Sequence, residues 1–355
     1  MNRPQVLIPS DNRDFVFGVA EGYARLGWDP IVGVSNFDLE AGNPVLFHLQ
    51  WPEELTGWKP PSASVLSKVL GTLDRWAART KILMSVHNLH PHRNYGHPAF
   101  RALYEGCFQR ADVIHHFSNA SKELVCKEYP VAAGRHHVVR LGFNFERMLP
   151  HSRNRTVSRK NLGIEPDEFS SLVFGDLRSW SEVRLIEQGV SRARIRNKRL
   201  IAAVRLYEDA PRWKAKYHQL QWRVWQQRHN VVSRTDYIPD DDVHHLFDAA
   251  DAVIVARLNP LNSGVLNLAM TLGRFVIAPN IGAIPEFLSG TDNLLYDPNT
   301  PDGLQLAIER AAEMDRERIG IENHRIAAAW QWPDILSACL ANLPHERSLA
   351  HRAAE

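Results

Sequence analysis

Cysteine is scarce in this sequence, with three residues among 355, and no two of them form a Cys-x-x-Cys pair. Cys107, Cys126 and Cys339 lie far apart, which argues against a structural zinc site and against a disulfide framework. Long apolar runs are also missing, because no stretch approaches the roughly 18–20 residues of a membrane-spanning helix. The first residues, MNRPQVLIPSDNRDF, show no signal-peptide pattern. A reducing cytoplasm is therefore the expected location.

An excess of charge of one sign is likewise absent, because 42 Lys and Arg residues stand against 40 Asp and Glu residues. Proteins that bind nucleic acid are normally more basic, so no nucleic-acid partner is expected. What the sequence does have is 44% hydrophobic and 23% charged residues, over a length that suits two domains of ordinary size. These values predict a globular protein with enough apolar side chains for two cores.

Short apolar runs alternate with helix-like segments along most of the chain, which is typical of α/β domains with parallel sheets. Residues 1–150 are expected to form one such domain. Residues 151–168 are polar, basic and aperiodic, so we interpret them as a connection between domains; the alternative is a long loop within one domain. A second series over 169–330 predicts a second domain. Residues 331–355 are expected to form a C-terminal helix, for which packing back on the first domain is one option.

The most informative stretch, Asp251 to Leu288, contains an apolar run, a polar loop, a helical segment and a second apolar run. It predicts a strand–helix–strand unit with the loop at the carboxyl end of the first strand. Ser263 and Gly264 open the helix, where free backbone N–H groups and the positive end of the helix dipole suit a phosphate or diphosphate. The alternative is an ordinary N-capped crossover without a ligand.

This stretch resembles the donor-nucleotide half of GT-B glycosyltransferases, in which a loop and a helix with the pattern SG…lAm..G.pVIAp..G.ipE hold a sugar nucleotide. The matching positions are Gly273, Val276, Ile277, Ala278, Pro279, Gly282, Pro285 and Glu286. The resemblance implies an α/β fold of two Rossmann-like parallel-sheet domains that face each other across a cleft. It also implies a nucleotide-sugar donor on 169–330 and an acceptor on 1–150. No metal or other cofactor is implied, because Arg and helix dipoles stabilise the leaving diphosphate in this fold.

The same resemblance implies which residues contact the donor. They are Arg178, Tyr237, Asn262, Ser263, Gly264, Asn267 and Glu286. For Arg178, which follows a strand and a Gly-containing loop, the alternative role is an ordinary ion pair. The sequence departs from the large retaining family, whose paired Glu residues are replaced here by Pro260 and Leu268 and whose Lys is replaced by Ser181. These departures favour an enzyme outside that family, with an inverting mechanism.

Two residues at predicted strand ends of the first domain, Glu53 and His87, are the expected catalytic groups. An inverting transferase needs a base for the proton of the acceptor hydroxyl, and a partly buried carboxylate with a raised pKa would serve. Glu53 is the first choice for this base. The other candidates by position are Glu54, Asp11, Asp14 and His87. His87 lies in a segment, HNLHPH, that resembles the stretch facing the transferred sugar in GT-B enzymes. A metal on His87, His90 and His92 is the weaker alternative, because no carboxylate or Cys accompanies the rings.

Basic residues gather between 192 and 228, where a dense run from Arg192 to Arg199 precedes a segment with Trp among Lys and Arg. Trp213, Trp222 and Trp225 are spaced as on a helix. One interpretation is contact with anionic lipid headgroups or with a lipid-diphosphate acceptor. The other, slightly favoured, is a solvated helix face whose tryptophans pack inward.

Together these features predict a glycosyltransferase that moves a sugar from a GDP- or UDP-sugar to a glycan or lipid-diphosphate-linked oligosaccharide. The segments WPE and HNLHPH resemble bacterial exopolysaccharide glycosyltransferases of the xanthan β-mannosyltransferase type, which implies a role in polysaccharide biosynthesis. We expect a cytoplasmic protein, with the inner face of the plasma membrane as a further location and anionic membrane as a partner. A non-catalytic nucleotide-sugar or glycan-binding protein and a nucleotide-sugar epimerase of the same fold are the alternatives.

Overall fold

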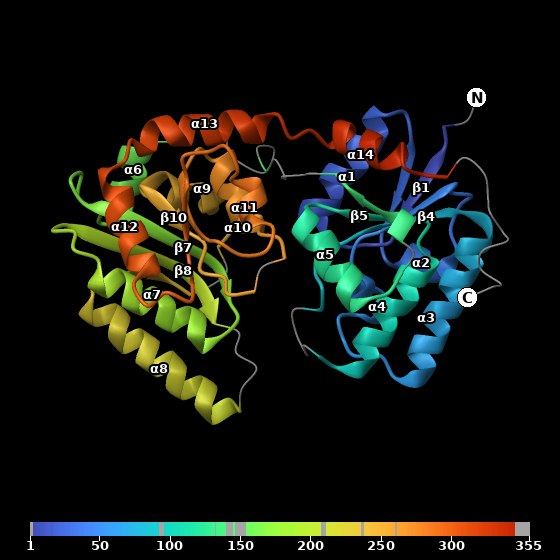
Figure 1. The fold of residues 1–355 in the computed structure, drawn as a ribbon, viewed down its shortest axis with the longest axis horizontal. Helices are drawn as coiled ribbons and strands as arrows, with labels where there is room; N and C mark the ends of the chain where they lie inside the picture. The colour runs from blue at the N-terminus through green and yellow to red at the C-terminus, as the bar shows by residue number, and fades with distance from the viewer. Residues whose placement is uncertain are drawn as a thin grey trace. The chain divides into compact units, whose positions relative to one another are not determined.

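The computed structural model describes residues 3–91, 96–131, 133–139, 145, 154–206, 211–235, 238–259 and 261–344, except for the side chains of residues 13 and 14. The chain divides into two compact units, one made of Met1–Leu141 with Gln331–Glu355 and the other of Gly142–Trp330. Figure 1 shows that each unit is a sheet with helices on both faces. Each unit therefore has a core of its own.

Within its described residues, the first unit has a six-stranded parallel sheet of order β2-β1-β3-β4-β5-β6. The strands are β1 (Gln5–Ile8), β2 (Asp29–Val32), β3 (Leu46–Leu49), β4 (Lys81–Ser85), β5 (Val113–His116) and β6 (His136–Val138). The helices are α1 (Arg13–Arg25), α2 (Ser35–Leu39), α3 (Ala63–Arg79), α4 (Pro98–Arg110), α5 (Asn119–Glu128) and α14 (Trp332–Leu340), with the 3-10 turns η1 (Pro52–Thr56) and η2 (Ala133–Arg135). Val6, Leu7 and Ile8 are fully buried, as expected of a parallel strand covered on both faces.

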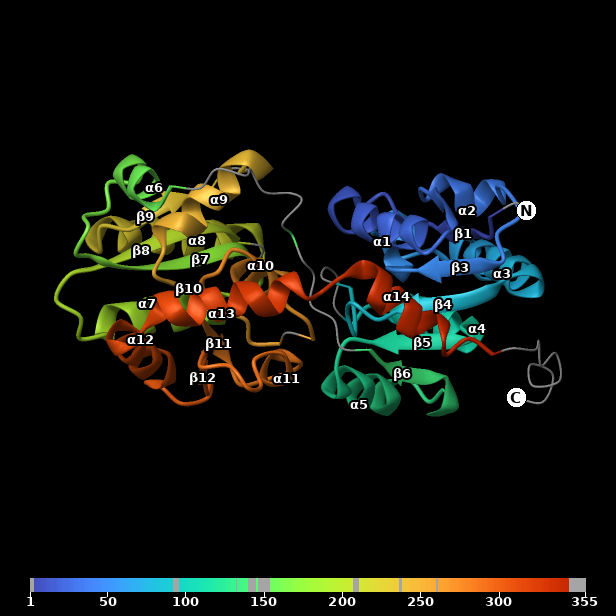
Figure 2. The same ribbon diagram turned by 90° about the horizontal axis from the view of Figure 1, so that it is seen from above.

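Helix α14 brings the carboxyl-terminal part of the chain back to the first unit, where it packs against α1 (Figure 2). Gly18 and Gly22 lie one turn apart on α1, and a Cβ at either position would come closer than 3.0 Å to Trp332. The two missing side chains thus make the hollow that Trp332 fills. The Trp332 ring also meets Phe15 edge-on, with 5.0 Å between centroids.

The second unit has, in the part that the structure describes, a six-stranded parallel sheet of order β12-β11-β10-β7-β8-β9. The strands are β7 (Phe169–Leu177), β8 (Lys198–Leu206), β9 (Val232–Arg234), β10 (Ala252–Ile254), β11 (Phe275–Pro279) and β12 (Leu294–Tyr296). The helices are α6 (Arg155–Asn161), α7 (Trp180–Arg192), α8 (Arg212–Arg228), α9 (Asp240–Ala249), α10 (Gly264–Thr271), α11 (Ile284–Phe287), α12 (Gly303–Glu313) and α13 (Arg316–Ala328). Apolar side chains of α7, α8 and α12 cover one face, and those of α9 and α10 the other. Across the described residues of both units, no helix is long and apolar enough to cross a bilayer.

Within 151–168, which the sequence predicts to be a connection between domains, residues 155–161 form α6, which packs against α9. Asn154 starts this helix by accepting the backbone N–H of Val157 at 3.1 Å. Arg159 is 5% exposed and donates to the hydroxyl of Ser170 and to the carbonyl of Ala249. A buried guanidinium group with several acceptors looks the same in a sequence as a solvated one, so a basic stretch does not by itself indicate a surface loop.

Candidate functional site

The order of strands in the second sheet changes direction between β7 and β10, the first and fourth strands of that sheet along the chain. In open α/β sheets, ligands bind beyond the carboxyl ends of the strands at this switch point, because the crossovers on its two sides diverge and leave a crevice. Arg178 directly follows β7, and Arg257 lies in the loop after β10. The topology therefore brings two arginines that are distant in the sequence to the same place.

Glu182, in the first turn of α7, holds the loops after β7 and β10 together. Its carboxylate accepts the backbone N–H of Arg178 at 2.6 Å and that of Leu258 at 3.3 Å. The guanidinium of Arg257 lies 3.6 Å from the same carboxylate, and the Glu182 side chain is only 5% exposed. A buried acid with donors from both loops sets the position of each loop relative to the other.

Arg257 is close enough to Arg178 to disfavour the charge of Arg178. Burial, and next the positive charge of Arg257, lower the pKa of Arg178 to about 10, and burial also lowers the pKa of Arg257. The negative charges of Glu182 and Asp176 act on both arginines and oppose the lowering of their pKa values. Asp176 also forms an ion pair with Arg205 at 3.0 Å. An anionic ligand at the switch point would favour the charged form of both arginines.

Helix α10 begins beside the end of β7. Gly175 in β7 has a φ of 90°, a left-handed conformation that suits glycine, and its missing side chain points at Val265 Cγ2, 3.5 Å away. Ser263 accepts the N–H of Leu266 at 3.2 Å, so it is the N-cap of α10. Gly264 is exposed, with no atom within 4 Å of the position that its Cβ would take. The positive end of α10 is therefore open to a ligand at its first turn.

The other donor contacts that the sequence predicts differ in exposure. Asn262 and Glu286 are half-buried, in the loop before α10 and in α11. Asn267 is 2% exposed, and within the described part of the chain its Oδ1 has no hydrogen-bond partner. It therefore lies beneath the surface of α10 instead of on it. Tyr237 and Pro260 fall outside the described residues, so the structure does not test their predicted positions.

The first sheet has a switch point of its own, between β1 and β3. The loops after these strands meet, because Glu54 Oε1 accepts the backbone N–H of Asp11 at 2.7 Å. Asp11 Oδ1 in turn accepts the N–H of Val34, after β2, at 3.1 Å. Burial raises the pKa of Glu54. Two of the candidate bases thus hold strand-end loops together, and the side chain of a third, Asp14, is not described.

The structure corrects the position expected for Glu53. The residue is 0% exposed in η1, where the hydroxyl of Tyr104 donates to its Oε2 at 2.7 Å. Burial raises the pKa of Glu53, although the hydrogen bond from Tyr104 opposes the shift. Its carboxylate is thus enclosed by the first unit and not exposed to solvent. The sequence places an acid correctly after β3, but the turn η1 directs it against α4, which contains Tyr104.

His87, by contrast, is half-buried just after β4, among aromatic rings. Its ring stacks on Trp51 with 4.2 Å between centroids and meets Phe15 edge-on at 4.7 Å. Its Nε2 lies 2.8 Å from Gln50 Oε1, which only accepts hydrogen bonds, so Nε2 carries a proton. Gln50 is 1% exposed, and its own Nε2 lacks a partner among the described residues.

The alternative of a metal on three histidines is only partly tested. Among the described residues, no group of three or more His, Cys, Asp or Glu side chains is arranged to hold a metal ion. His92 lies outside those residues. Burial lowers the pKa of His90, which disfavours its charged form.

Sequence reasoning missed Glu182, Arg257 and Gln50. Arg257 follows an apolar run as Arg178 does, so its position after a strand is a usable signal. What the sequence alone does not show is that β7 and β10 are neighbours. Glu182 and Gln50 carry no local signal, because their roles depend on loops that reach them from other strands.

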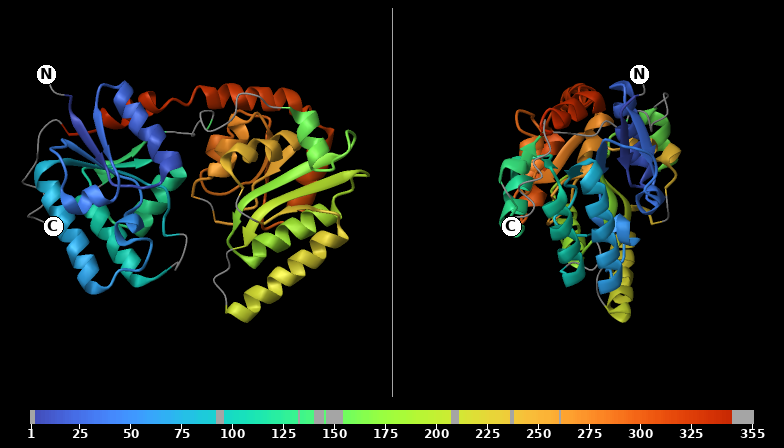
Figure 3. Two further views of the ribbon diagram at one scale, coloured as in Figure 1. Left: turned by 180° about the vertical axis from the view of Figure 1, so that it is seen from behind. Right: turned by 90° about the vertical axis from the view of Figure 1, so that its right-hand side faces the viewer.

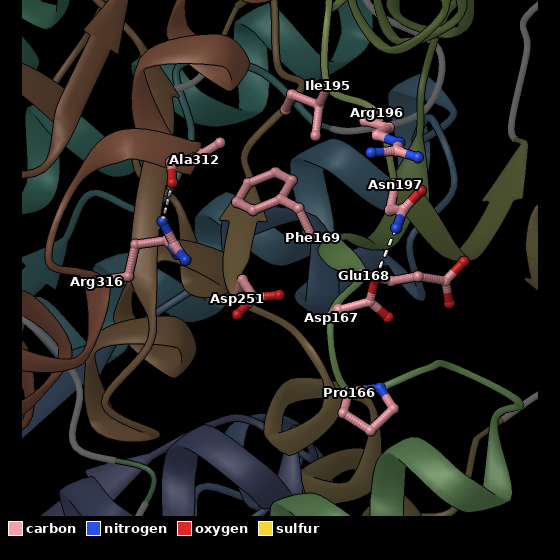
Figure 4. A pocket seen from close by; sticks show the side chains of 10 residues that line it. All are labelled: Pro166, Asp167, Glu168, Phe169, Ile195, Arg196, Asn197, Asp251, Ala312 and Arg316. Atoms are coloured by element: carbon pink, nitrogen blue, oxygen red, sulfur yellow. Dashed lines mark hydrogen bonds between the residues drawn. The ribbon is translucent and has the colours of Figure 1, made fainter.

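Two cavities of the second unit lie at the opposite, amino-terminal edge of its sheet. One, of about 350 Å³, is bounded by residues that precede β7, β8 and β10, among them Glu168, Asn197 and Asp251 (Figure 4). The other, of about 600 Å³, shares Asp251 and Arg316 with it. Asp251 pairs with Arg155 at 2.7 Å, and Arg316 donates to carbonyl groups at the end of α12. These polar groups have structural partners, and the cavities are remote from the switch point.

Comparisons with known proteins bear on both units. Residues 172–314, within the second unit, match the family described as Glycosyl transferases group 1. No curated protein matches the sequence. Sucrose-phosphate synthase (tll1590) from Thermosynechococcus elongatus has a similar structure, with a TM-score of 0.67 and 16% identity over 96% of this chain and 98% of that chain. Alr3699/HepE from Anabaena, solved in complex with UDP-glucose, has a TM-score of 0.71 and 14% identity over 96% and 99% of the two chains.

A third similar structure is the catalytic domain of starch synthase IV from Arabidopsis thaliana, bound to ADP and acarbose. The alignment covers 97% of this chain and 99% of the starch synthase chain, with 12% identity and a TM-score of 0.68. At such identities the solved structures show the fold alone, and this fold, GT-B, extends over both units. The match to glycosyl transferases group 1 rests on the sequence of the second unit. The chain is therefore a glycosyltransferase with the GT-B fold.

Proposed function

We propose that this glycosyltransferase moves a sugar from a nucleoside-diphosphate sugar to a glycan or lipid-linked oligosaccharide. The observation that carries the proposal is the pair Arg178 and Arg257, which share the carboxylate of Glu182 at the switch point. Alr3699/HepE, of similar fold, was solved with UDP-glucose. We propose a UDP- or GDP-sugar as the donor here, with its diphosphate at the two guanidinium groups and the open first turn of α10.

The proposed donor site also stabilises the leaving group. When the bond between sugar and diphosphate breaks, additional negative charge develops on the leaving phosphate. Buried cations and a helix dipole that are already in place stabilise that charge without reorganisation at the moment of reaction. For this reason we expect the transfer to need neither a divalent metal nor another cofactor.

We further propose that the displacement inverts the anomeric centre. The resemblance to the large retaining family implies that Pro260 and Leu268 take the places of its two Glu residues, which supports a mechanism without contacts that orient a sugar for same-face attack. In the proposed step the acceptor hydroxyl oxygen attacks the anomeric carbon from the face opposite the diphosphate. The bond to the diphosphate breaks with its electron pair, and His87 takes the hydroxyl proton. His87 replaces Glu53 as the base because it is accessible and Glu53 is fully buried.

Aromatic rings of the first unit support a carbohydrate acceptor. Trp58 is 44% exposed, and its ring centroid is 6.5 Å from that of Trp51, which stacks on His87. Trp58 also has a φ of 62°, a conformation that costs an L-residue roughly 1–2 kcal/mol. Exposed indole rings suit the apolar face of a sugar ring. We propose that the acceptor glycan is carried on a lipid diphosphate in bacterial polysaccharide biosynthesis, at the cytoplasmic face of the membrane.

Calorimetric titration of the pure protein with UDP and with GDP tests the donor site. We expect at least one of them to bind, and we expect Gly264→Asp to abolish binding because a carboxylate would stand at the positive end of α10. Gly264→Ala is the matched control, since its methyl group enters open space without a charge. The proposed donor site is wrong if neither nucleotide binds, or if the two variants bind equally well.

A further inference from the structure

Helix α8 has an apolar stripe on its outer side. Its members, with exposed fractions of 73, 56, 60 and 38%, are Trp213, Tyr217, Leu220 and Val224. Their spacing of four, three and four residues places them on one line along a helix. His218, Trp222 and Gln226 lie on the opposite side and are buried. Figure 3 shows α8, in yellow, at the outside of the second unit.

Exposed cations border this stripe on both sides. At 100° per residue, Arg212, Lys216 and Arg223 lie along one border, and Lys214 and Arg228 lie along the other. All five are exposed, and α8 contains neither Asp nor Glu. The helix therefore combines an apolar outer line with a charge of one sign.

We propose that α8 binds flat on the surface of an anionic lipid bilayer. An interfacial helix buries its apolar line at the boundary of headgroups and acyl chains, while cations on its borders attract anionic headgroups. Trp213 and Tyr217 suit that depth, because each has an apolar ring with a polar group at its edge. With a length of about 25 Å, the helix offers several turns of contact.

The charge of α8 favours a bilayer over a second copy of this chain. Pairing two such stripes would bring two sets of five cations together, with no carboxylate on either helix to offset them. An anionic bilayer supplies the opposite charge and the apolar phase at once. The slightly favoured interpretation of this segment, a solvated face with its tryptophans packed inward, holds for Trp222 but is wrong for Trp213.

This inference extends the proposed function, because a lipid-linked acceptor is embedded in a membrane. Its test is independent of that function, because no nucleotide or acceptor is added. The protein is sedimented with vesicles of phosphatidylcholine alone and with vesicles that also contain phosphatidylglycerol. We expect binding to the mixed vesicles only, and weaker binding at high salt.

Variants in matched pairs locate the contact. Lys214→Gln/Lys216→Gln should weaken vesicle binding about 25-fold, at about 5-fold for each cation removed near an anionic surface. Lys59→Gln/Lys127→Gln removes the same charge from exposed positions of the first unit and should bind as wild type. Trp213→Ser/Leu220→Ser should also lose binding. Its control, Leu306→Ser/Ile321→Ser, removes apolar side chains that are 51% and 67% exposed and should not.

The thermal midpoint of each variant confirms that it is folded. The proposal is wrong if wild-type protein does not bind the mixed vesicles, or if the controls lose as much binding as the α8 variants. It is also wrong if sedimentation velocity shows a dimer that Trp213→Ser/Leu220→Ser abolishes, because the stripe would then belong to a contact between two copies.

Discussion

The guanidinium of Arg257 lies 3.6 Å from the carboxylate of Glu182, and neither group is on the open surface. The same carboxylate accepts the backbone N–H of Arg178, so one acid positions two cations that follow neighbouring strands. A buried ion pair adds little net stability, because the cost of desolvation offsets much of the Coulomb attraction. A ligand that needs two cations at a fixed spacing explains the arrangement better than stability does.

Arg178→Ala and Arg257→Ala should each weaken UDP or GDP binding by about 1.5–3 kcal/mol, the range for a hydrogen bond to a charged group. The loss for Arg257→Ala should lie at the upper end, since it also leaves the buried carboxylate of Glu182 without its cation. Arg318→Ala is the control, because Arg318 forms an exposed ion pair with Asp292. Calorimetry that gives wild-type affinity for either variant would show that the arginine serves only the loops.

Sequence patterns predict this fold well where the signal is local. The strand at Phe275–Pro279 and the helix after Ser263 are marked by apolar runs, a cap and glycines within a few residues. Helix α6 escapes the same reasoning because its stability depends on distant partners. Arg159 is buried only because the carbonyl of Ala249 and the hydroxyl of Ser170 accept its hydrogen bonds.

The candidate site likewise contains residues that a local sequence signal predicts and residues whose roles depend on distant parts of the chain. Arg178 and Gly264 are predictable, because each stands at the edge of a recognisable element. The proximity of Arg178 and Arg257 is not predictable, because it depends on the order of strands in the sheet. The direction of Glu53 is not predictable either. It is set by Tyr104, a partner 51 residues further along the chain.

His87→Ala should reduce turnover by about 10²–10⁴, the usual contribution of a general base. Glu53→Gln should leave turnover close to wild type, because the amide oxygen still accepts from Tyr104 and the position is fully buried. Steady-state rates at saturating donor measure both effects. If the Glu53→Gln variant is slow and the His87→Ala variant has normal turnover, then Glu53 is the general base and His87 is not. The anomeric configuration of the product, by NMR, tests inversion separately.

Gly22→Ala should destabilise the first unit by about 1–3 kcal/mol, as overpacking of a core does. Its methyl group would lie 2.6 Å from Trp332 Cβ and 2.8 Å from Leu336 Cδ1, which forces α14 away from α1. Gly71→Ala is the matched comparison, because a Cβ there meets nothing within 4 Å and alanine favours a helix by about 0.5–1 kcal/mol. Chemical unfolding should move the two midpoints in opposite directions. Shifts of the same sign would contradict the packing of α14 on α1.

A buried row of polar side chains crosses the first sheet and makes stability depend on pH. Tyr23, His48, Ser85 and His115 are joined by hydrogen bonds of 2.9, 2.9 and 3.1 Å, and His115 Nε2 lies 3.0 Å from the carbonyl oxygen of Val139. A carbonyl only accepts, so His115 Nε2 carries a proton. Each donor is then determined in turn, back to the hydroxyl of Tyr23. Every hydrogen bond of the row is satisfied with both histidines neutral.

Acid should therefore destabilise the protein before its carboxylates are protonated. Burial, and next the neighbouring His115, lower the pKa of His48 to about 3, and burial lowers that of His115 to about 4. In the unfolded chain both are near 6.5, so between about pH 6.5 and 4 the unfolded chain binds protons that the folded chain does not. The free energy of unfolding should therefore decrease as the pH is lowered from about 6.5 to 4, by up to about 1.4 kcal/mol per pH unit for each His. Above this pH range it should not depend on these two histidines.

Urea unfolding near neutral pH and at mildly acid pH measures this slope. His48→Gln/His115→Gln should be less stable near neutral pH, because the row is disturbed, but its stability should change less with pH because two titrating groups are gone. Equal slopes for the double variant and the wild type would show that the buried row is not the source of the acid sensitivity.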